Sequence, residues 1–125
     1  MHDLESVVEE YLSSLEGGHR RLAPTEWGLT VESPPGWPLH VGVALRDGLL
    51  RVQTEALPPD RVGDHELLHR NRGLRFARYT HAGDGTVWVE ADVPPQAVTP
   101  QLLDRLLGSV VAAATAVRER ARALQ

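Results

Sequence analysis

The sequence contains no cysteine, no lysine and no isoleucine among its 125 residues. The absence of cysteine excludes disulfides, thiolate zinc sites, iron–sulfur clusters and cysteine nucleophiles. No apolar run approaches the roughly 20 residues needed to span a bilayer, so we expect no membrane association. All 13 basic residues are arginine. The joint loss of lysine and isoleucine indicates codon bias in a GC-rich genome and carries no functional information.

The remaining composition is typical of an ordinary soluble globular protein, with 42% hydrophobic and 24% charged residues. A chain of this length predicts one domain over residues 1–125. Its net charge of −4 makes nucleic-acid binding unfavourable. The acidic start, Met1-His2-Asp3-Leu4-Glu5, lacks the basic and apolar regions of a signal peptide, which predicts a cytoplasmic protein.

Helical spacing of apolar residues predicts a helix at each end of the chain. Residues 4–15 carry apolar side chains at the i, i+3, i+4, i+7 positions of one face, and Asp3 is a plausible N-cap. Thr99-Pro100 predicts the start of the last helix, whose apolar stripe continues almost to the C-terminus. A short helical segment is expected over residues 60–72, with a possible start at an Asp64 cap.

Alternation of apolar and polar residues predicts five strands between these helices. They are expected at residues 27–31, 39–46, 50–55, 74–81 and 87–93, and Asp47-Gly48 is typical of a type I′ hairpin turn. The expected order is therefore α-βββ-α-ββ-α. Hairpins imply an antiparallel sheet, and its apolar face needs a cover. We predict an α+β fold in which the two terminal helices pack on one face of the sheet.

The most specific local motif is His65-Glu66-Leu67-Leu68-His69, which matches the H-E-x-x-H pattern of zinc metalloproteases. Residues i and i+4 share a helix face, so two imidazoles could bind one zinc ion while Glu66 acts as general base. A third protein ligand is missing at the usual extension of this motif, where Arg75 stands. Catalytic residues, bound metal and cofactors are therefore not expected, and zinc hydrolysis through His65, Glu66 and His69 is the alternative.

An outward-facing aromatic residue suggests a contact surface. Trp88 alternates with Val87 and Val89, so it is expected on the sheet face away from the helices, where local packing is the competing interpretation. We predict that the outward face near four residues contributes to dimer or partner contact: His40, Arg51, Tyr79 and Trp88.

Several segments of the second half resemble the YbjN family of bacterial proteins, within the type III secretion chaperone-like fold. These segments are Leu67-Leu68-His69-Arg70-Asn71-Arg72, Leu74-Arg75-Phe76-Ala77-Arg78-Tyr79, residues 83–94 with their Asp-Gly hairpin, and Thr99-Pro100-Gln101-Leu102-Leu103. The resemblance covers residues 65–110, and residues 1–60 match in pattern only. It implies a small cytoplasmic protein without catalytic activity. Type III chaperones, in addition, are homodimers that bind extended segments of client proteins.

The leading hypothesis is therefore a chaperone-like or regulatory homodimer that binds a client protein and catalyses no reaction. The zinc metallohydrolase described above is the second hypothesis. A regulatory domain that binds a small ligand is the third, although no sequence motif indicates a pocket for one.

Overall fold

The structure, a computed structural model, describes residues 3–32 and 36–125. The elements follow the chain as α1 (Leu4–Ser13), β1 (Arg20–Ala23), β2 (Glu26–Val31), β3 (Leu39–Arg46), β4 (Leu49–Leu57), α2 (Asp64–Asn71), β5 (Arg78–His81), β6 (Val87–Val93), a 3-10 turn η1 (Pro95–Ala97) and α3 (Pro100–Ala123).

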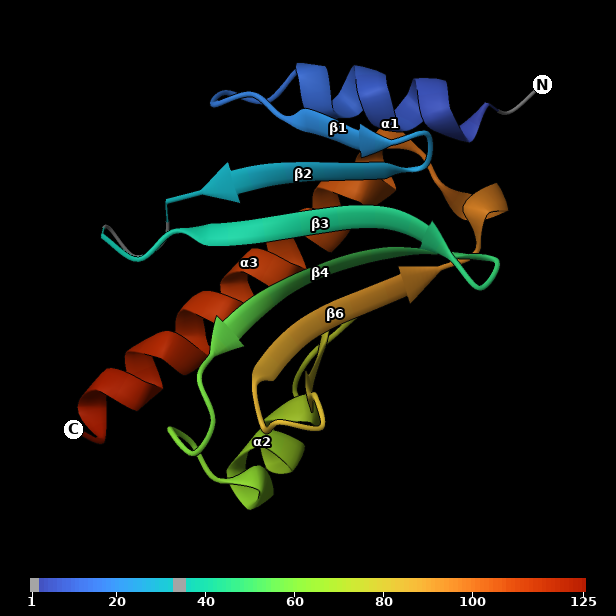
Figure 1. Ribbon diagram of the computed structural model, residues 1–125. Helices are drawn as coiled ribbons and strands as arrows, with labels where there is room; N and C mark the ends of the chain where they lie inside the picture. The colour runs from blue at the N-terminus through green and yellow to red at the C-terminus, as the bar shows by residue number, and fades with distance from the viewer. Residues whose placement is uncertain (1–2, 33–35) are drawn as a thin grey trace.

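The six strands form one antiparallel sheet in the order β1-β2-β3-β4-β6-β5 (Figure 1). The β3–β4 connection is the predicted two-residue hairpin. Asp47 and Gly48 both have positive φ angles, 52° and 77°, as a type I′ turn requires. The sequence-adjacent strands β4 and β5 are separated by β6, which places β1 and β5 at the two edges of the sheet.

Helix α3 crosses one face of the sheet diagonally, and α1 lies beside it at the β1–β2 end (Figure 1). Thr99 caps α3 as predicted, because its side chain accepts a hydrogen bond from the Leu102 amide. The phenol of Tyr11 in α1 donates to the Asp104 carboxylate of α3 at 2.9 Å. The apolar residues of both helices and of the inward sheet face form one core. The predicted α+β fold, with both terminal helices on one face, is confirmed.

Strand β1 was not predicted from the sequence. Its residues Arg20–Ala23 are mostly exposed, so they show no alternation of apolar and polar types. The strand predicted over residues 74–81 is shorter and begins only at Arg78. The preceding residues form a turn in which the Ala77 amide donates to the Arg75 carbonyl at 2.7 Å. Phe76, at the centre of this turn, has a φ of 66° that no strand contains.

The short helix α2 begins at Asp64, with Gly63 rather than Asp64 in the N-cap position. Residues 60–63 lie outside it, and Asp60 has a left-handed φ of 65°. No helix within the described residues is both long and apolar enough to cross a membrane.

Candidate functional site

The sheet face opposite the helices carries three of the four residues predicted to contact a partner. His40 of β3 is exposed, and Trp88 of β6 and Arg51 of β4 are half-buried, while their strand neighbours Val41 and Val89 are buried against the helices. This separation follows from the two-residue period of a strand. The outward position predicted for His40, Arg51 and Trp88 is confirmed, and their role in binding stays a prediction.

The outward position predicted for Tyr79 is wrong. Its side chain is only 5% exposed, and its hydroxyl donates to the Ala113 carbonyl of α3 at 2.6 Å. The turn at Phe76 explains the error, because regular alternation starts after that residue rather than at residue 74. Tyr79 pairs with the inward residue Val89. It is therefore a core residue that attaches the edge strand β5 to α3.

A hollow lies over the middle of β2 and β3 on the outward face. Gly28 and Gly42 are directly paired across these strands, and neither contributes a side chain to the surface. The resulting hollow has a volume of about 530 Å³, and its walls include Leu22, His40 and Trp88. Leu22 is 59% exposed, and its Cδ1 atom lies 3.3 Å from where a Cβ at Gly28 would stand. Two glycines at outward strand positions were the sequence signal for this hollow.

A second hollow of about 490 Å³ adjoins the first one at the end of β4. It is lined in part by Trp37, Pro58 and Arg118, and it shares His40 and Trp88 with the first hollow. Because these two residues border both spaces, the hollows are neighbours on the molecular surface. We call the two hollows together the sheet groove. Its walls combine aromatic and aliphatic surface with few charged groups.

Arg118 is the functional candidate that the sequence analysis missed. Its side chain leaves α3 and is only 4% exposed. Nε donates to the Ala56 carbonyl at 2.8 Å, Nη1 donates to the Trp37 and Pro38 carbonyls at 2.6 and 3.3 Å, and Nη2 donates to the Glu55 carbonyl at 3.4 Å. The guanidinium also lies over the Trp37 ring, 4.1 Å from its centroid. Burial lowers the pKa of Arg118, although an arginine remains protonated.

The position of Arg118 was visible in the sequence. It follows Ala114 by four residues and precedes Ala121 by three, so it belongs to the apolar stripe of α3. A charged residue within such a stripe indicates a buried polar contact. The sequence could not show that the contact is with backbone carbonyls of a distant strand.

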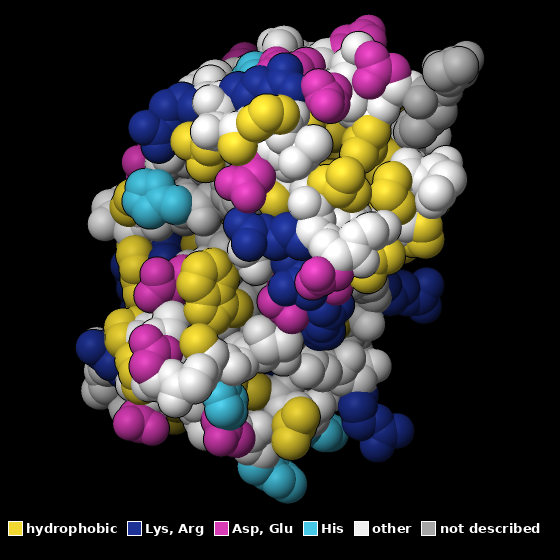
Figure 2. All heavy atoms as spheres, turned by 45° about the vertical axis from the view of Figure 1, so that its right-hand side comes forward, with side chains coloured by type: hydrophobic (Ala, Val, Ile, Leu, Met, Phe, Trp, Pro, Cys, Tyr) yellow, Lys and Arg dark blue, Asp and Glu magenta, His cyan; other side chains and the backbone are white. Residues whose placement is uncertain are grey.

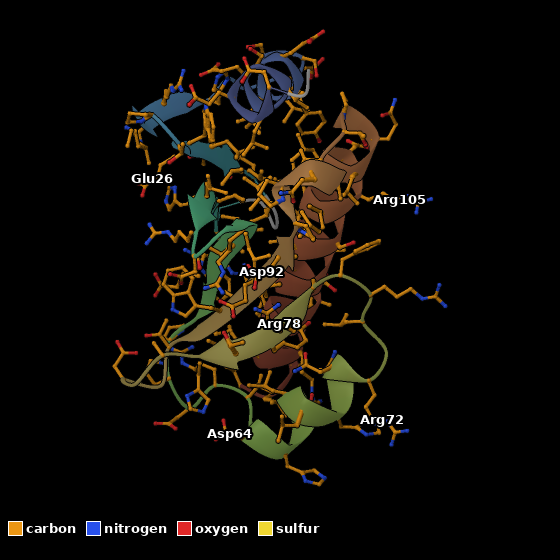
Figure 3. The ribbon with its side chains drawn as sticks, turned by 90° about the vertical axis from the view of Figure 1, so that its right-hand side faces the viewer. Glu26, Asp64, Arg72, Arg78, Asp92 and Arg105 are labelled. Atoms are coloured by element: carbon orange, nitrogen blue, oxygen red, sulfur yellow. The ribbon has the colours of Figure 1, made fainter. Side chains whose placement is uncertain are left out.

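An ion-pair network occupies the other end of the outward face. Arg51 Nε donates to Asp92 at 2.7 Å, and Arg78 Nη2 donates to Glu90 at 3.0 Å and to Asp92 at 2.7 Å. Figure 2 shows basic and acidic side chains in contact in the middle of the molecule, and Figure 3 shows Arg78 and Asp92 side by side on neighbouring strands. The hydrogen bond from Arg51 is the main cause that lowers the pKa of Asp92. These groups neutralise one another.

The H-E-x-x-H residues lie on α2, away from the sheet groove. His65 and His69 are exposed, and the Glu66 carboxylate accepts hydrogen bonds from Arg70 and Arg120 at 2.9 to 3.0 Å. Arg120, and then Arg70, lowers the pKa of Glu66 to about 2. No group of three or more histidine, aspartate or glutamate residues in the described part of the chain is placed to hold a metal ion. The geometry therefore gives no support to a zinc site.

The fold is similar to that of solved chaperone complexes. The chain matches the HopA1–SchA chaperone–effector complex with a TM-score of 0.72 at 11% sequence identity, covering 91% of each chain. It matches the ExsC–ExsE complex with a TM-score of 0.61 at 15% identity, covering 94% of this chain and 96% of the other. It also matches the Yersinia pestis type III secretion chaperone SycH, solved with a fragment of YscM2, with a TM-score of 0.63 at 16% identity, covering 91% and 98%.

The fold is type III secretion chaperone-like. The similarity extends over almost the whole chain, whereas the identities of 11% to 16% carry information about the fold alone. By sequence, no family model and no curated protein matches the chain.

Proposed function

We propose that this chain is a chaperone-like protein that binds a segment of a client protein and catalyses no reaction. The observation that carries the proposal is the TM-score of 0.72 with a chaperone–effector complex over 91% of both chains. The sheet groove supplies a surface suited to this role, because its apolar walls are open and lie on a rigid sheet. A client would bind in the sheet groove and contact His40 and Trp88, which border both hollows.

The proposal includes a homodimer in a bacterial cytoplasm, related to the YbjN family through residues 65–110. Exposed apolar surface beside the edge strand β5 supports self-association. Leu68 is 69% exposed and borders a hollow of about 310 Å³ together with Tyr79 and His81, and Phe76 is 48% exposed nearby in the chain. A second copy of the chain would cover this exposed apolar surface.

The first test is the native mass of the purified chain, measured without added metal or chelator. We expect a species of twice 13.8 kDa that carries no stoichiometric metal. Leu68→Glu should shift this species toward the monomer, while Glu119→Gln on the exposed side of α3 should not. A wild-type monomer would refute the homodimer. One zinc per chain, lost in His65→Ala, would instead favour the hydrolase.

The second test is selection from a displayed library of random peptides. The wild-type chain should enrich peptides that share a sequence pattern. The Gly42→Leu variant should not enrich these peptides, because the new side chain fills part of the sheet groove. Ala112→Leu adds the same group at an exposed position of α3 and serves as the matched control. Enrichment that survives Gly42→Leu would place client binding elsewhere, and no enrichment by the wild type would contradict the function.

A further inference from the structure

Arg118 is a buried cation that forms no hydrogen bond or ion pair with a carboxylate among the described residues. Its hydrogen bonds there all go to backbone carbonyls, and the Glu55 carboxylate acts on it only through its charge. Burying an ion is costly unless opposite charge compensates it. Carbonyl dipoles, the Trp37 ring and the charge of the Glu55 carboxylate provide part of this compensation, while one N–H group of the guanidinium keeps no hydrogen-bond partner among the described residues. The site therefore favours the approach of an anion.

The guanidinium also retains donor capacity toward a ligand. It has five N–H groups, and its bonds to the carbonyls of Trp37, Pro38, Ala56 and Glu55 engage four of them. The bond from Nη2 is the longest at 3.4 Å, and the fifth N–H belongs to the same nitrogen. Arg118 lines the second hollow of the sheet groove, so a ligand in that hollow lies next to the residue with this free capacity.

The walls of the second hollow determine what kind of anion fits. Trp37, Trp88, Pro38 and Pro58 make most of its surroundings apolar. A small hydrated ion makes few favourable contacts with apolar walls. A carboxylate attached to an apolar group can pack that group against the walls while its oxygens reach Arg118. The low local dielectric strengthens a charge-assisted hydrogen bond with the guanidinium. His40, which also borders the hollow, is exposed to solvent.

We propose that the hollow between Trp37 and Trp88 binds a carboxylate of the client segment through Arg118, with an adjoining apolar side chain of the segment packed between the tryptophans. This inference rests on the proposed client-binding function and adds the chemistry of the segment. The carboxylate belongs either to the C-terminus of a chain or to an aspartate or glutamate side chain. The same guanidinium would bind both.

The test uses small probes and the full-length chain. N-acetyl-leucine carries a terminal carboxylate, N-acetyl-leucinamide lacks it, and N-acetyl-glutamyl-leucinamide carries a side-chain carboxylate. Each is titrated to about 10 mM while the NMR signals of the Arg118 Nε–H and of the tryptophan indoles are followed. We expect the two carboxylate probes to shift the signals of Arg118, Trp37 and Trp88. N-acetyl-leucinamide should bind with an affinity at least about tenfold lower. The tighter of the two identifies the source of the carboxylate.

Two variants separate binding from structural effects without removing Arg118. Trp88→Ala removes one wall of the hollow and should lower the affinity for the carboxylate probes about fivefold or more, since an aromatic contact is lost. Arg105→Gln removes an exposed cation of α3 that borders neither hollow, and it should leave the affinity unchanged. A loss of binding in Arg105→Gln, with Trp88→Ala unaffected, would overturn the assignment.

The remaining outcomes distinguish a failure of carboxylate recognition from a failure of the proposed client-binding function. Equal affinity for N-acetyl-leucine and its amide would overturn carboxylate recognition while leaving an apolar client site in place. Absence of any shift with all three probes would also overturn it, with peptide selection still deciding whether the chain binds clients. Failure of the peptide selection alongside carboxylate-selective shifts would instead contradict the proposed function and leave an anion site.

Discussion

The charged side chains at the two ends of the outward sheet face have different partners. At one end, Arg51 and Arg78 bind the carboxylates of Glu90 and Asp92, so the charges neutralise one another. At the other end, the sheet groove exposes apolar walls, and its buried cation Arg118 is hydrogen-bonded to backbone carbonyls instead of to a carboxylate of the described residues. The same strands, β4 and β6, cross both regions. The comparison contrasts a surface whose charges are paired with a mostly apolar groove that has no such pairing among the described residues, and this contrast is why we assign client binding to the groove end in the proposed function.

The largest expected effect tests how far the groove depends on its buried cation. Arg118→Leu leaves the carbonyls of Trp37, Pro38 and Ala56 without their donor, and buried unsatisfied carbonyls are costly. We expect a loss of about 3 kcal/mol in the free energy of unfolding, measured by urea denaturation. Arg120→Leu, two residues further along α3 at the surface, is the matched control and should lose much less. Equal losses would show that Arg118 has no special structural role.

The next effect concerns binding rather than stability. Gly42→Leu places a side chain in the groove, and a Cβ at Gly42 comes no closer than 4.0 Å to a neighbour, the Gln53 carbonyl. The fold should therefore tolerate the change, while affinity for a selected client peptide falls about tenfold or more, or about 1.4 kcal/mol. Titration calorimetry measures the affinity, and thermal unfolding checks the fold. Unchanged affinity in a folded variant would remove the groove from the binding surface.

A smaller effect is expected at the ion-pair end. Asp92→Asn weakens hydrogen bonds from Arg51 and Arg78, and we expect a loss of about 1 kcal/mol in unfolding free energy at pH 7. The native pKa of Asp92 lies below its unfolded value of about 3.9, so its contribution is present above that pH and is lost as the pH falls further. Denaturant unfolding of the wild type and of Asp92→Asn between pH 7 and pH 3 measures the difference between their unfolding free energies. This difference should become smaller only at the acidic end of the range. Client affinity should not change.

The sequence predicted the inward half of the molecule better than the outward half. Apolar periodicity is a strong signal, so the two terminal helices and the inward valines were found, and the Asp47-Gly48 dipeptide identified the hairpin. The left-handed turn at Phe76 breaks alternation without a glycine or proline to mark it, and the orientation of Tyr79 was therefore wrong. Strand β1 is mostly exposed and leaves no pattern. The groove depends on contacts between distant segments, such as Arg118 with Ala56, which no local spacing encodes.

The smallest effect is expected at Glu66, which forms ion pairs with Arg70 and Arg120 on the helices instead of the sheet. Arg120 and Arg70 hold its pKa at about 2, well below its ordinary value, so the pair stabilises the protein above pH 4.5 and loses that effect as the pH falls toward 2. Because these side chains are accessible, solvent and salt screen the interaction. Glu66→Gln should lower the melting temperature slightly at pH 7, and less in 1 M salt, whereas Glu119→Gln should have no effect. Thermal unfolding of Asp92→Asn under the same conditions provides the comparison. If Glu66→Gln lowered the melting temperature as much as Asp92→Asn does, the location of an ion-pair cluster, on helix or sheet, would not determine its contribution to stability.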